Sequence, residues 1–307
     1  MSTQIIPKKK KSTLSEEGPS YKVFTVFNYI FLTLLILITA YPVYYVVIAS
    51  FSNAKALSAH LGMLWLPLQP MSVTAYELVF RHPLVLSGYM NTIFILVVGL
   101  AFNIALTCLG AYFLTLRDSM IKRPISLLIL FTMYFSGGIV PSYLNVKELG
   151  MMDSLFSLII PGAISTYNML IMRSAFASVP ASLSEAAELD GAGHFRQLTQ
   201  VFIPLAGATL AVMVLYYGVG HWNAWFNASL YIQTPSKYPL QLVLRQLLLL
   251  SSKQNELVGM TDVGDQVLYV DLVKYALIVV STLPMMLLYP FLQRFFVKGV
   301  MVGALKG

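Results

Sequence analysis

Long apolar runs separated by short polar breaks make up most of this chain. The runs cover residues 24–51, 88–116, 124–143, 155–177, 202–226 and 267–291. Because an α-helix needs about 20 apolar residues to cross the hydrocarbon core of a bilayer, the pattern predicts an all-α, polytopic membrane protein with six transmembrane helices. The first run is longer than the apolar core of a signal peptide, about 7–15 residues, so we expect it to remain as a span.

The polar segments divide the chain around these spans. Prolines in the stretch 52–87 argue against a long helix there. The segment 227–266 is predicted to be a long loop, with Arg245 and Leu248 on one face of an amphipathic piece. The predicted parts of the chain are an N-terminal tail with four consecutive lysines, a six-span domain and a C-terminal tail, at residues 1–20, 21–294 and 295–307.

Lysine and arginine are distributed unequally between the predicted breaks. With the N-terminus inside the cell, thirteen of the 20 fall in inner segments and seven in outer segments. Cytoplasmic flanks of membrane proteins carry the excess of these residues. The distribution therefore predicts that both termini and the break at 178–201 lie in the cytoplasm, and that the loop at 227–266 lies outside.

Composition supports the membrane assignment and narrows the chemistry. Hydrophobic residues make up 57% of the chain and charged residues 11%, against about 25% charged residues in soluble domains. The basic pI of about 9.3 is explained by the cytoplasmic flanks, so we expect no nucleic-acid partner. Cys108 is a single cysteine, and the four histidines have no metal-ligand spacing. The sequence predicts no metal, no cofactor and no catalytic residue.

The sequence shows no energy source of its own. No Asp or Glu lies near the middle of a predicted span, where ion-coupled carriers keep a buried carboxylate, and the G-x-x-x-x-G-K-[ST] phosphate loop is missing. We therefore expect a non-enzymatic transport subunit that a separate ATPase drives. Two other classes stay open. An ATP-independent secondary carrier for a small polar solute needs a buried ion site, and a membrane enzyme needs convergent reactive groups.

The break at 178–201 is typical of a short helix that docks into a partner. Ser182 stands three residues before Glu185, which is the spacing of a capping box. Pro180 ends the preceding segment, and Gly191 can close the helix in the left-handed conformation. A two-turn cytoplasmic helix with small residues on one face suits a soluble partner. The alternative is that Glu185 only caps the helix locally.

The same segment resembles the EAA loop of permease subunits from bacterial ABC importers. The family pattern is Glu-Ala-Ala, three residues, Gly, nine residues and Ile-x-Leu-Pro; this chain has EAA at 185–187, glycine at 191 and V-x-I-P at 201–204. The resemblance to the carbohydrate-uptake group extends to YFSGGIVP, GHWNAWFN, YPLQL and FVKG, at residues 134–141, 220–227, 238–242 and 296–299. It implies a type I ABC importer for oligosaccharides in the bacterial cytoplasmic membrane.

The resemblance also implies partners and site residues. The partners are a second permease subunit, two ATPase subunits, an extracellular solute-binding protein, the oligosaccharide and membrane lipid. In the family, the loop sits in a cleft of one ATPase and converts closure of the ATPase dimer into alternating access. The residues implied for this coupling are Glu185, Ala186, Ala187, Leu189, Asp190 and Gly191. Asp190 and Arg196 are expected to form a local pair. Charge reversal at Glu185 or the substitution Gly191→Trp should abolish sugar uptake.

Aromatic and amide side chains in or near the spans are candidates for the sugar path. Aromatic rings stack on sugars, and amides bind hydroxyl groups. The candidates are Asn223, Trp222, Trp225, Tyr134, Ser136 and Asn168. For the tryptophans the alternative is an interfacial belt or packing, and for the others a hydrogen bond to a neighbouring helix. Gly137-Gly138 before Pro141 suggests either a broken helix bordering a cavity or a closely packed glycine pair.

Overall fold

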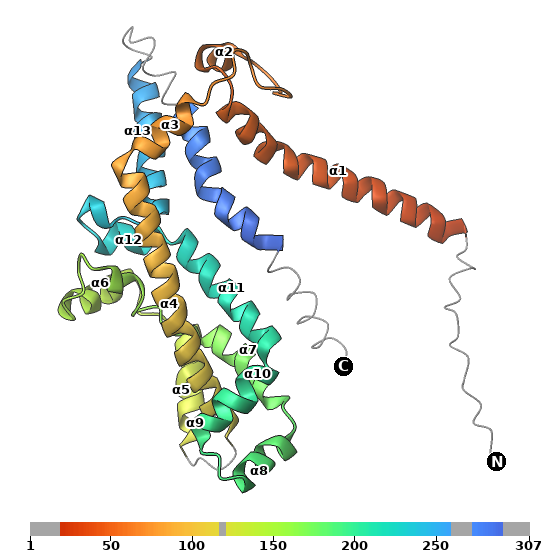
Figure 1. Ribbon diagram of the computed structural model, residues 1–307, viewed down its shortest axis with the longest axis vertical. Helices are drawn as coiled ribbons and strands as arrows, with labels where there is room; N and C mark the ends of the chain where they lie inside the picture. The colour runs from red at the N-terminus through yellow and green to blue at the C-terminus, as the bar shows by residue number, and fades with distance from the viewer. Residues whose placement is uncertain (1–18, 117–120, 259–271, 291–307) are drawn as a thin grey trace.

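A computed structural model describes residues 19–116, 121–258 and 272–290, and every regular element in these ranges is a helix (Figure 1). The long helix α4 (Pro83–Thr115) runs down the bundle, and α7 (Thr166–Ala177), α11 (Gly207–Asn223) and α13 (Leu240–Val258) pack against it. The helix α8 (Ala181–Leu189) lies at the opposite end of the bundle from α2 (Ala54–Ala59) and α3 (Thr74–Arg81). The all-α prediction is confirmed for the described residues.

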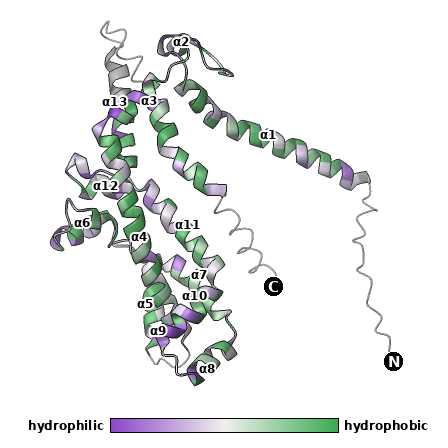
Figure 2. Ribbon diagram, in the orientation of Figure 1, coloured by the Kyte–Doolittle hydropathy of each residue, from purple (hydrophilic) through white to green (hydrophobic). Residues whose placement is uncertain are grey.

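The first helix, α1 (Pro19–Ser50), leaves the bundle (Figure 1), and hydrophobic residues occupy much of its length (Figure 2). Phe27 is 65% exposed and Leu37 66% exposed within this chain. A 32-residue helix with so much exposed apolar surface is stable only when lipid or another subunit covers it. The predicted first span is therefore present, but this chain alone does not bury it.

The second span begins five residues earlier than the sequence predicts. Pro83 occupies the start of α4 instead of breaking a helix, because the first turn needs no backbone N–H from that residue. The preceding stretch is not without helices either. It contains α2, which is capped by the Asn53 side chain accepting from the N–H groups of Lys55 and Ala56, and it also contains α3.

Two pairs of consecutive helices are sharply bent, and the first pair covers the predicted third span. α5 (Lys122–Tyr134) and α6 (Ile139–Glu148) meet at 117°, across a break that contains Gly138 at φ +87°. This is the broken helix that the Gly-Gly-x-x-Pro pattern suggested. A second bend of 87° separates residues 194–205, which include α9 (His194–Gln197), a π-helical turn (Leu198–Phe202) and α10 (Ile203–Leu205), from α11.

By length and composition, three described helices could each cross a membrane, namely Ser20–Ser50, Pro83–Thr115 and Leu272–Pro290, and the count rises to five if each bent pair is one span. The predicted fourth span, 155–177, is not one continuous helix. It consists of a 3₁₀ turn (Leu155–Leu158), a break of turns and bends containing Pro161 and Gly162, and the 12-residue α7. α7 by itself is too short to cross a bilayer.

Side chains from two neighbouring helices satisfy the backbone of this break. The Asn103 amide donates to the carbonyls of Gly162 and Ala163 at 3.1 and 2.9 Å, and the Ser165 N–H donates to the Tyr217 hydroxyl at 2.9 Å. Non-helical backbone persists at membrane depth only where protein groups satisfy it. Asn103 on α4 and Tyr217 on α11 do this here, so the break is a stable part of the fold.

The predicted long loop at 227–266 contains helices in its described part, including the piece with Arg245 and Leu248. The chain there forms most of α12 (Phe226–Tyr231), a 3₁₀ turn (Pro235–Lys237) and the whole of the 19-residue α13. The apolar run at 247–250 lies inside α13, so its leucines continue a helix that packs on α4. Residues 1–18, 117–120, 259–271 and 291–307 lie outside the described residues. Both predicted tails and the two ends of the sixth span fall largely there.

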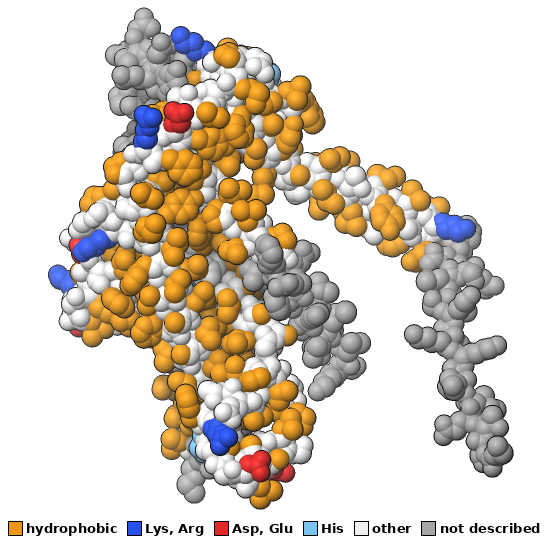
Figure 3. Space-filling view, viewed as in Figure 1, with side chains coloured by type: hydrophobic (Ala, Val, Ile, Leu, Met, Phe, Trp, Pro, Cys, Tyr) orange, Lys and Arg blue, Asp and Glu red, His pale blue; other side chains and the backbone are white. Residues whose placement is uncertain are grey.

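The core nearest to α8 lies between α4, α7 and α11. Met172, Phe176 and Met213 are at most 1% exposed there, and Phe202 from the π-helical turn packs against them. Figure 3 shows apolar side chains over much of the surface, with Asp and Glu at the end where α8 lies. The core therefore joins the polar α8 end directly to the long helix α4.

Candidate functional site

The helix α8 begins two residues earlier than a capping box at Ser182 would require. Pro180 is the N-cap, its carbonyl accepts from the Leu183 N–H at 3.1 Å, and no side chain caps this end. The predicted Ser182–Glu185 capping box is therefore wrong, because Ser182 already lies in the first turn. Glu185 is not needed to close this helix, which leaves its exposed carboxylate available for a partner.

The other end of α8 closes as the sequence predicts. Gly191 has φ +76°, and its N–H donates to the Glu188 carbonyl at 2.9 Å. The Ala192 N–H donates to the Ala187 carbonyl at 2.9 Å, which completes a Schellman motif. A Cβ at position 191 would meet no atom within 4 Å. Glycine is thus favoured by its backbone conformation and not by lack of space within this chain.

A buried glutamine ties α8 to the transmembrane bundle. Gln197 of α9 is 2% exposed. Its Oε1 accepts from the Ser184 hydroxyl of α8 at 3.1 Å and from the Tyr112 hydroxyl of α4 at 3.3 Å, and its Nε2 donates to the Ala192 carbonyl at 3.0 Å. His194 Nδ1 lies 3.1 Å from the same tyrosine hydroxyl. If His194 carries its proton on Nδ1, both bonds of the tyrosine form together.

The sequence prediction missed this cluster, which we call the Gln197 junction: Tyr112, Ser184, Ala192, His194 and Gln197. One signal for it is that His194 and Gln197 stand three residues apart, which places them on one face of a helix. The partner Tyr112 is more than 70 residues away in sequence, and no local pattern connects it to α8.

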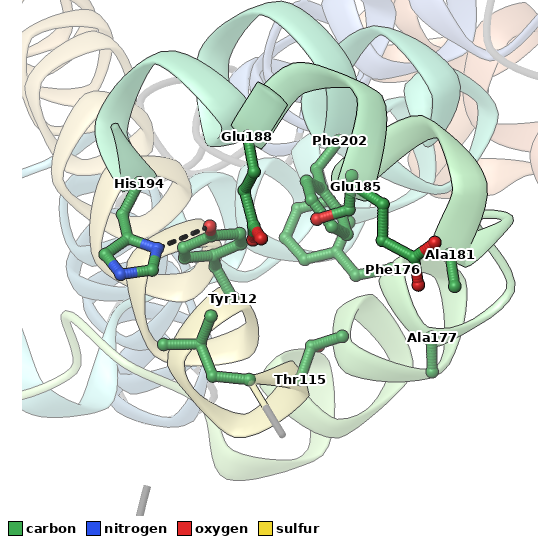
Figure 4. Close-up of a pocket in the computed structure, with 11 residues that line it drawn as sticks. Tyr112, Thr115, Phe176, Ala177, Ala181, Glu185, Glu188, His194 and Phe202 are labelled. Carbon is green, nitrogen blue, oxygen red and sulfur yellow. Dashed lines mark hydrogen bonds between the residues drawn. The ribbon is translucent and has the colours of Figure 1, made fainter. Parts of the chain in front are cut away.

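A cavity of about 720 Å³ separates α8 from the ends of α4 and α7 (Figure 4). Glu185 and Glu188 line it from α8, opposite Tyr112 and Phe176. Two carboxylates beside an aromatic wall suit a cationic side chain better than a neutral one.

The outer side of α8 is apolar and uncovered in this chain. Leu189 is 90% exposed, Leu183 is 43% exposed and Ala186 is exposed, whereas Ala187 is half-buried. The expected Asp190–Arg196 pair does not form. The Arg196 Nε instead donates to Gln200 Oε1 at 2.9 Å, one helical turn away. The predicted coupling residues therefore occupy one exposed helix, with the face of Leu189 and Ala186 directed away from the bundle.

The predicted path residues occupy three separate places. Trp222 is 5% exposed, its indole N–H donates to the Ser281 carbonyl at 3.2 Å, and its ring lies against Tyr89, so Trp222 packs in the core. Asn223 is exposed and donates to the Val219 carbonyl of its own helix at 3.0 Å. The half-buried Trp225 lies under the guanidinium of Arg245.

The other path candidates lie at the two breaks. Tyr134 is 85% exposed at the end of α5, and the Ser136 hydroxyl accepts from the Gly138 N–H at 3.3 Å inside the α5–α6 break. Asn168 is buried in the first turn of α7, directly after the break of the predicted fourth span. Tyr134 and Ser136 lie beside the break that the glycine pair at 137–138 suggested, whereas the sequence predicted Asn168 inside a continuous span.

An ion-pair clamp that the sequence did not suggest connects the segment after α6 to the segment after α12. Asp153, at φ +54°, accepts from the N–H groups of Gln233 and Thr234, each at 2.9 Å, and from the Lys237 ammonium at 2.8 Å. These donors, with Lys237 first, hold the pKa of the Asp153 carboxyl well below its ordinary value. The clamp therefore contains an ionised carboxylate at neutral pH.

Known proteins identify the class of this chain. No family model matches it. Over 292 residues it is 34% identical to the polygalacturonan/rhamnogalacturonan transport system permease protein YtcP of Bacillus subtilis (strain 168), covering 93% of this chain and 99% of YtcP. The chain belongs to the carbohydrate-uptake permeases of ABC transporters. Protein LplC of the same organism is 37% identical to this permease over 286 residues, covering 93% of the permease and 96% of LplC.

A solved structure shows the same architecture. The permease matches a chain in the crystal structure of a bacterial ABC transporter involved in the import of the acidic polysaccharide alginate, with a TM-score of 0.82 and 30% identity. The match covers 92% of the permease and 99% of that chain. The permease is therefore a multi-pass membrane protein with an ABC importer fold and is a transport subunit.

Proposed function

We propose that this permease is one half of a permease heterodimer in a bacterial importer for oligosaccharides released from acidic polysaccharides. Two separate ATPase subunits would drive it, and an extracellular binding protein would deliver the sugar. The support for an acidic substrate is that YtcP is named for polygalacturonan and rhamnogalacturonan, and that the matching structure imports alginate. The orientation that fits the lysine and arginine distribution has both termini and α8 in the cytoplasm.

The observation that carries this proposal is the combination of an exposed α8 and a buried junction behind it. The face with Leu189 and Ala186 is free for a cleft of the ATPase, while Gln197 joins the opposite side to α4. When ATP closes the ATPase dimer, the displaced α8 pulls on α4 through Gln197 and Tyr112. ATP shifts the population toward the outward-facing state only as far as it binds the closed ATPase more tightly than the open one.

The proposed sugar path uses candidate residues that lie at helix ends and beside the breaks. Asn223 lies at the end of α11, Tyr134 and Ser136 lie at the α5–α6 break, and Asn168 lies beside the break before α7. Broken helices at membrane depth are characteristic of transport paths, because their irregular backbone borders a cavity. Trp222 is not part of this proposed path, since its indole N–H and ring are occupied by packing.

The proposal is tested first by isolating the permease from native membranes in mild detergent and identifying its companions by mass spectrometry. A second permease and an ATPase are expected. The reconstituted complex should then import oligosaccharides in an ATP-dependent manner. Recovery of the permease alone, together with uptake that needs no ATP, would favour a secondary carrier instead.

Charge reversal at Glu185 tests the role of α8. We expect Glu185→Lys to reduce ATP-driven uptake by at least tenfold, because a cation at this position repels the basic side chain that two carboxylates attract. The matched control is Glu148→Lys, which reverses an exposed glutamate on α6. If the two variants took up sugar equally well, α8 would not be part of the coupling path.

A further inference from the structure

Arg245 and Trp225 form a stacked pair between α13 and the start of α12. The guanidinium carbon of Arg245 lies 3.6 Å from the centroid of the Trp225 ring. Trp225 is half-buried, and Phe226 meets it edge-on with ring centroids 5.5 Å apart. The indole also packs against the apolar cluster around Ile95 and Tyr231. Because the guanidinium covers the ring, Trp225 is not an open platform for a sugar.

The stack instead fixes Arg245 in one orientation. A guanidinium lying flat on an indole keeps its N–H donors around its edge, where they can meet a planar anion. Arg245 is exposed, and among the described residues no carboxylate lies within ion-pair distance of it. Lys237 differs from Arg245, because Asp153 already neutralises the Lys237 ammonium. Arg245 is therefore an oriented cation that this chain does not neutralise in its described part.

Two exposed asparagines stand two residues from Trp225 in the sequence, one on each side. Asn223 ends α11 and Asn227 lies in the first turn of α12, and both side chains are exposed. Amide groups of this kind bind hydroxyls, while the guanidinium binds a carboxylate through two parallel hydrogen bonds. A ligand that carries both groups on one ring is a uronic acid.

We propose that Arg245, held in place by Trp225, binds the carboxylate of a uronate unit as an acidic oligosaccharide enters the permease. Arg245 is then a residue that determines substrate specificity, and Trp225 is a positioning residue that acts through it. This inference rests on the proposed function, since it assumes that an acidic oligosaccharide is transported. Neutral oligosaccharides would pass the pair without this contact.

The test compares each acidic sugar with the same sugar made neutral. The reconstituted importer, with its binding protein and ATPases, is given trigalacturonate or trimannuronate and the trimethyl ester of each. For Arg245→Gln we expect the apparent KM for the acidic sugar to rise about tenfold, with the KM for the ester and the maximal rate unchanged. Arg245→Lys should fall between, because it keeps the charge but loses the planar fork. Trp225→Leu should raise the KM for the acid while leaving the ester unaffected.

The matched control is Lys147→Gln, which removes another exposed cation, on α6, and should leave the preference for acid over ester as it is. If Arg245→Gln reduced uptake of the acidic sugar and of its ester equally, the inference would be overturned, because Arg245 would then serve folding or a contact with another protein. The proposed function would survive that result. If the wild-type importer carried no acidic trisaccharide, the substrate class and the inference would fall together.

Anionic lipid is the competing source of an anion for Arg245. The same assay in vesicles of phosphatidylcholine alone, and in vesicles with added phosphatidylglycerol, separates the two. We expect Arg245→Gln to raise the KM for the acidic sugar, and not for its ester, in both membranes. If the effect of Arg245→Gln depends on phosphatidylglycerol and is the same for the acidic sugar and its ester, Arg245 binds lipid and the inference is overturned.

Discussion

At the residue scale, individual side chains hold together segments that are far apart in the sequence. Asp153 receives four groups from the segment 233–237, so one carboxylate fixes the segment after α6 to the turn after α12. Asn103 and Tyr217 serve the same purpose inside the bundle, where they satisfy the break before α7. Each of these contacts replaces a local helical hydrogen bond with a tertiary one, so the irregular segments are ordered by side chains.

The clamp at Asp153 predicts a pH dependence. Because the pKa of this carboxyl is lowered in the folded protein, its contribution to stability is complete above the unfolded pKa of about 3.9 and is lost as the pH falls below that value. The protection of the Gln233 and Thr234 N–H groups against hydrogen exchange, relative to an unstructured peptide at the same pH, should therefore fall in acid. Asp153→Asn should lower this protection already at pH 7 and flatten its acid dependence. Glu148→Gln is the control, and identical exchange in wild type and Asp153→Asn would contradict this account.

At the element scale, α8 is a short helix whose two sides have different surroundings. One side is exposed and apolar, and the other is attached through the Gln197 junction to α4. A helix of nine residues is not stable alone in water. Its Schellman closure at Gly191 and its hydrogen bonds to Gln197 therefore determine both its existence and its direction.

The substitution Gln197→Leu tests this attachment. It keeps the approximate volume but leaves the Ser184 hydroxyl, the Tyr112 hydroxyl and the Ala192 carbonyl without their partner, at a cost of about 1–3 kcal/mol. We expect the complex to assemble and hydrolyse ATP, while sugar uptake per ATP hydrolysed falls severalfold. Simultaneous measurement of uptake and ATPase rate gives this ratio. Gln200→Leu, at an exposed position three residues away, should leave the ratio unchanged, and an unchanged ratio in Gln197→Leu would show that α8 moves α4 by another route.

At the scale of the whole molecule, the permease is incomplete as a single chain. α1 leaves its apolar surface uncovered, and α8 projects from the far end of the bundle (Figure 1). The surface of α1 requires lipid or another membrane protein, and we propose a soluble protein as the partner of α8. The long α4 connects the end with α2 and α3 to the end with α8, so a displacement at one end can reach the other through one rigid helix.

This arrangement predicts the membrane sidedness of its two ends. In a Cys108→Ala background, Leu61→Cys near α2 should react with a membrane-impermeant maleimide in intact cells, and Leu189→Cys on α8 should react only after the membrane is opened. Leu61 is 96% exposed and Leu189 is 90% exposed, so access depends on the membrane and not on burial. Labelling of Leu189→Cys from outside would invert the proposed topology.

The sequence by itself determined the class of the protein and the closure of the short helix α8 at Gly191. Long apolar runs require helices in a membrane, and a glycine at position 191 favours the left-handed closure because it has no Cβ. These are local or compositional properties, so they can be read without a fold. The EAA spacing is local in the same sense, and the family that it indicated is the one to which the permease belongs.

Only the tertiary structure decided which spans are continuous and what each polar side chain contacts. The break at 159–165 exists because Asn103 and Tyr217, distant in sequence, replace its helical hydrogen bonds. The predicted capping box is absent because α8 begins at Ala181. The Trp225 ring, a candidate for stacking on a sugar, instead lies under the guanidinium of Arg245. Hydrogen bonds and stacking between distant segments depend on three-dimensional packing, which the periodicity of a sequence does not contain.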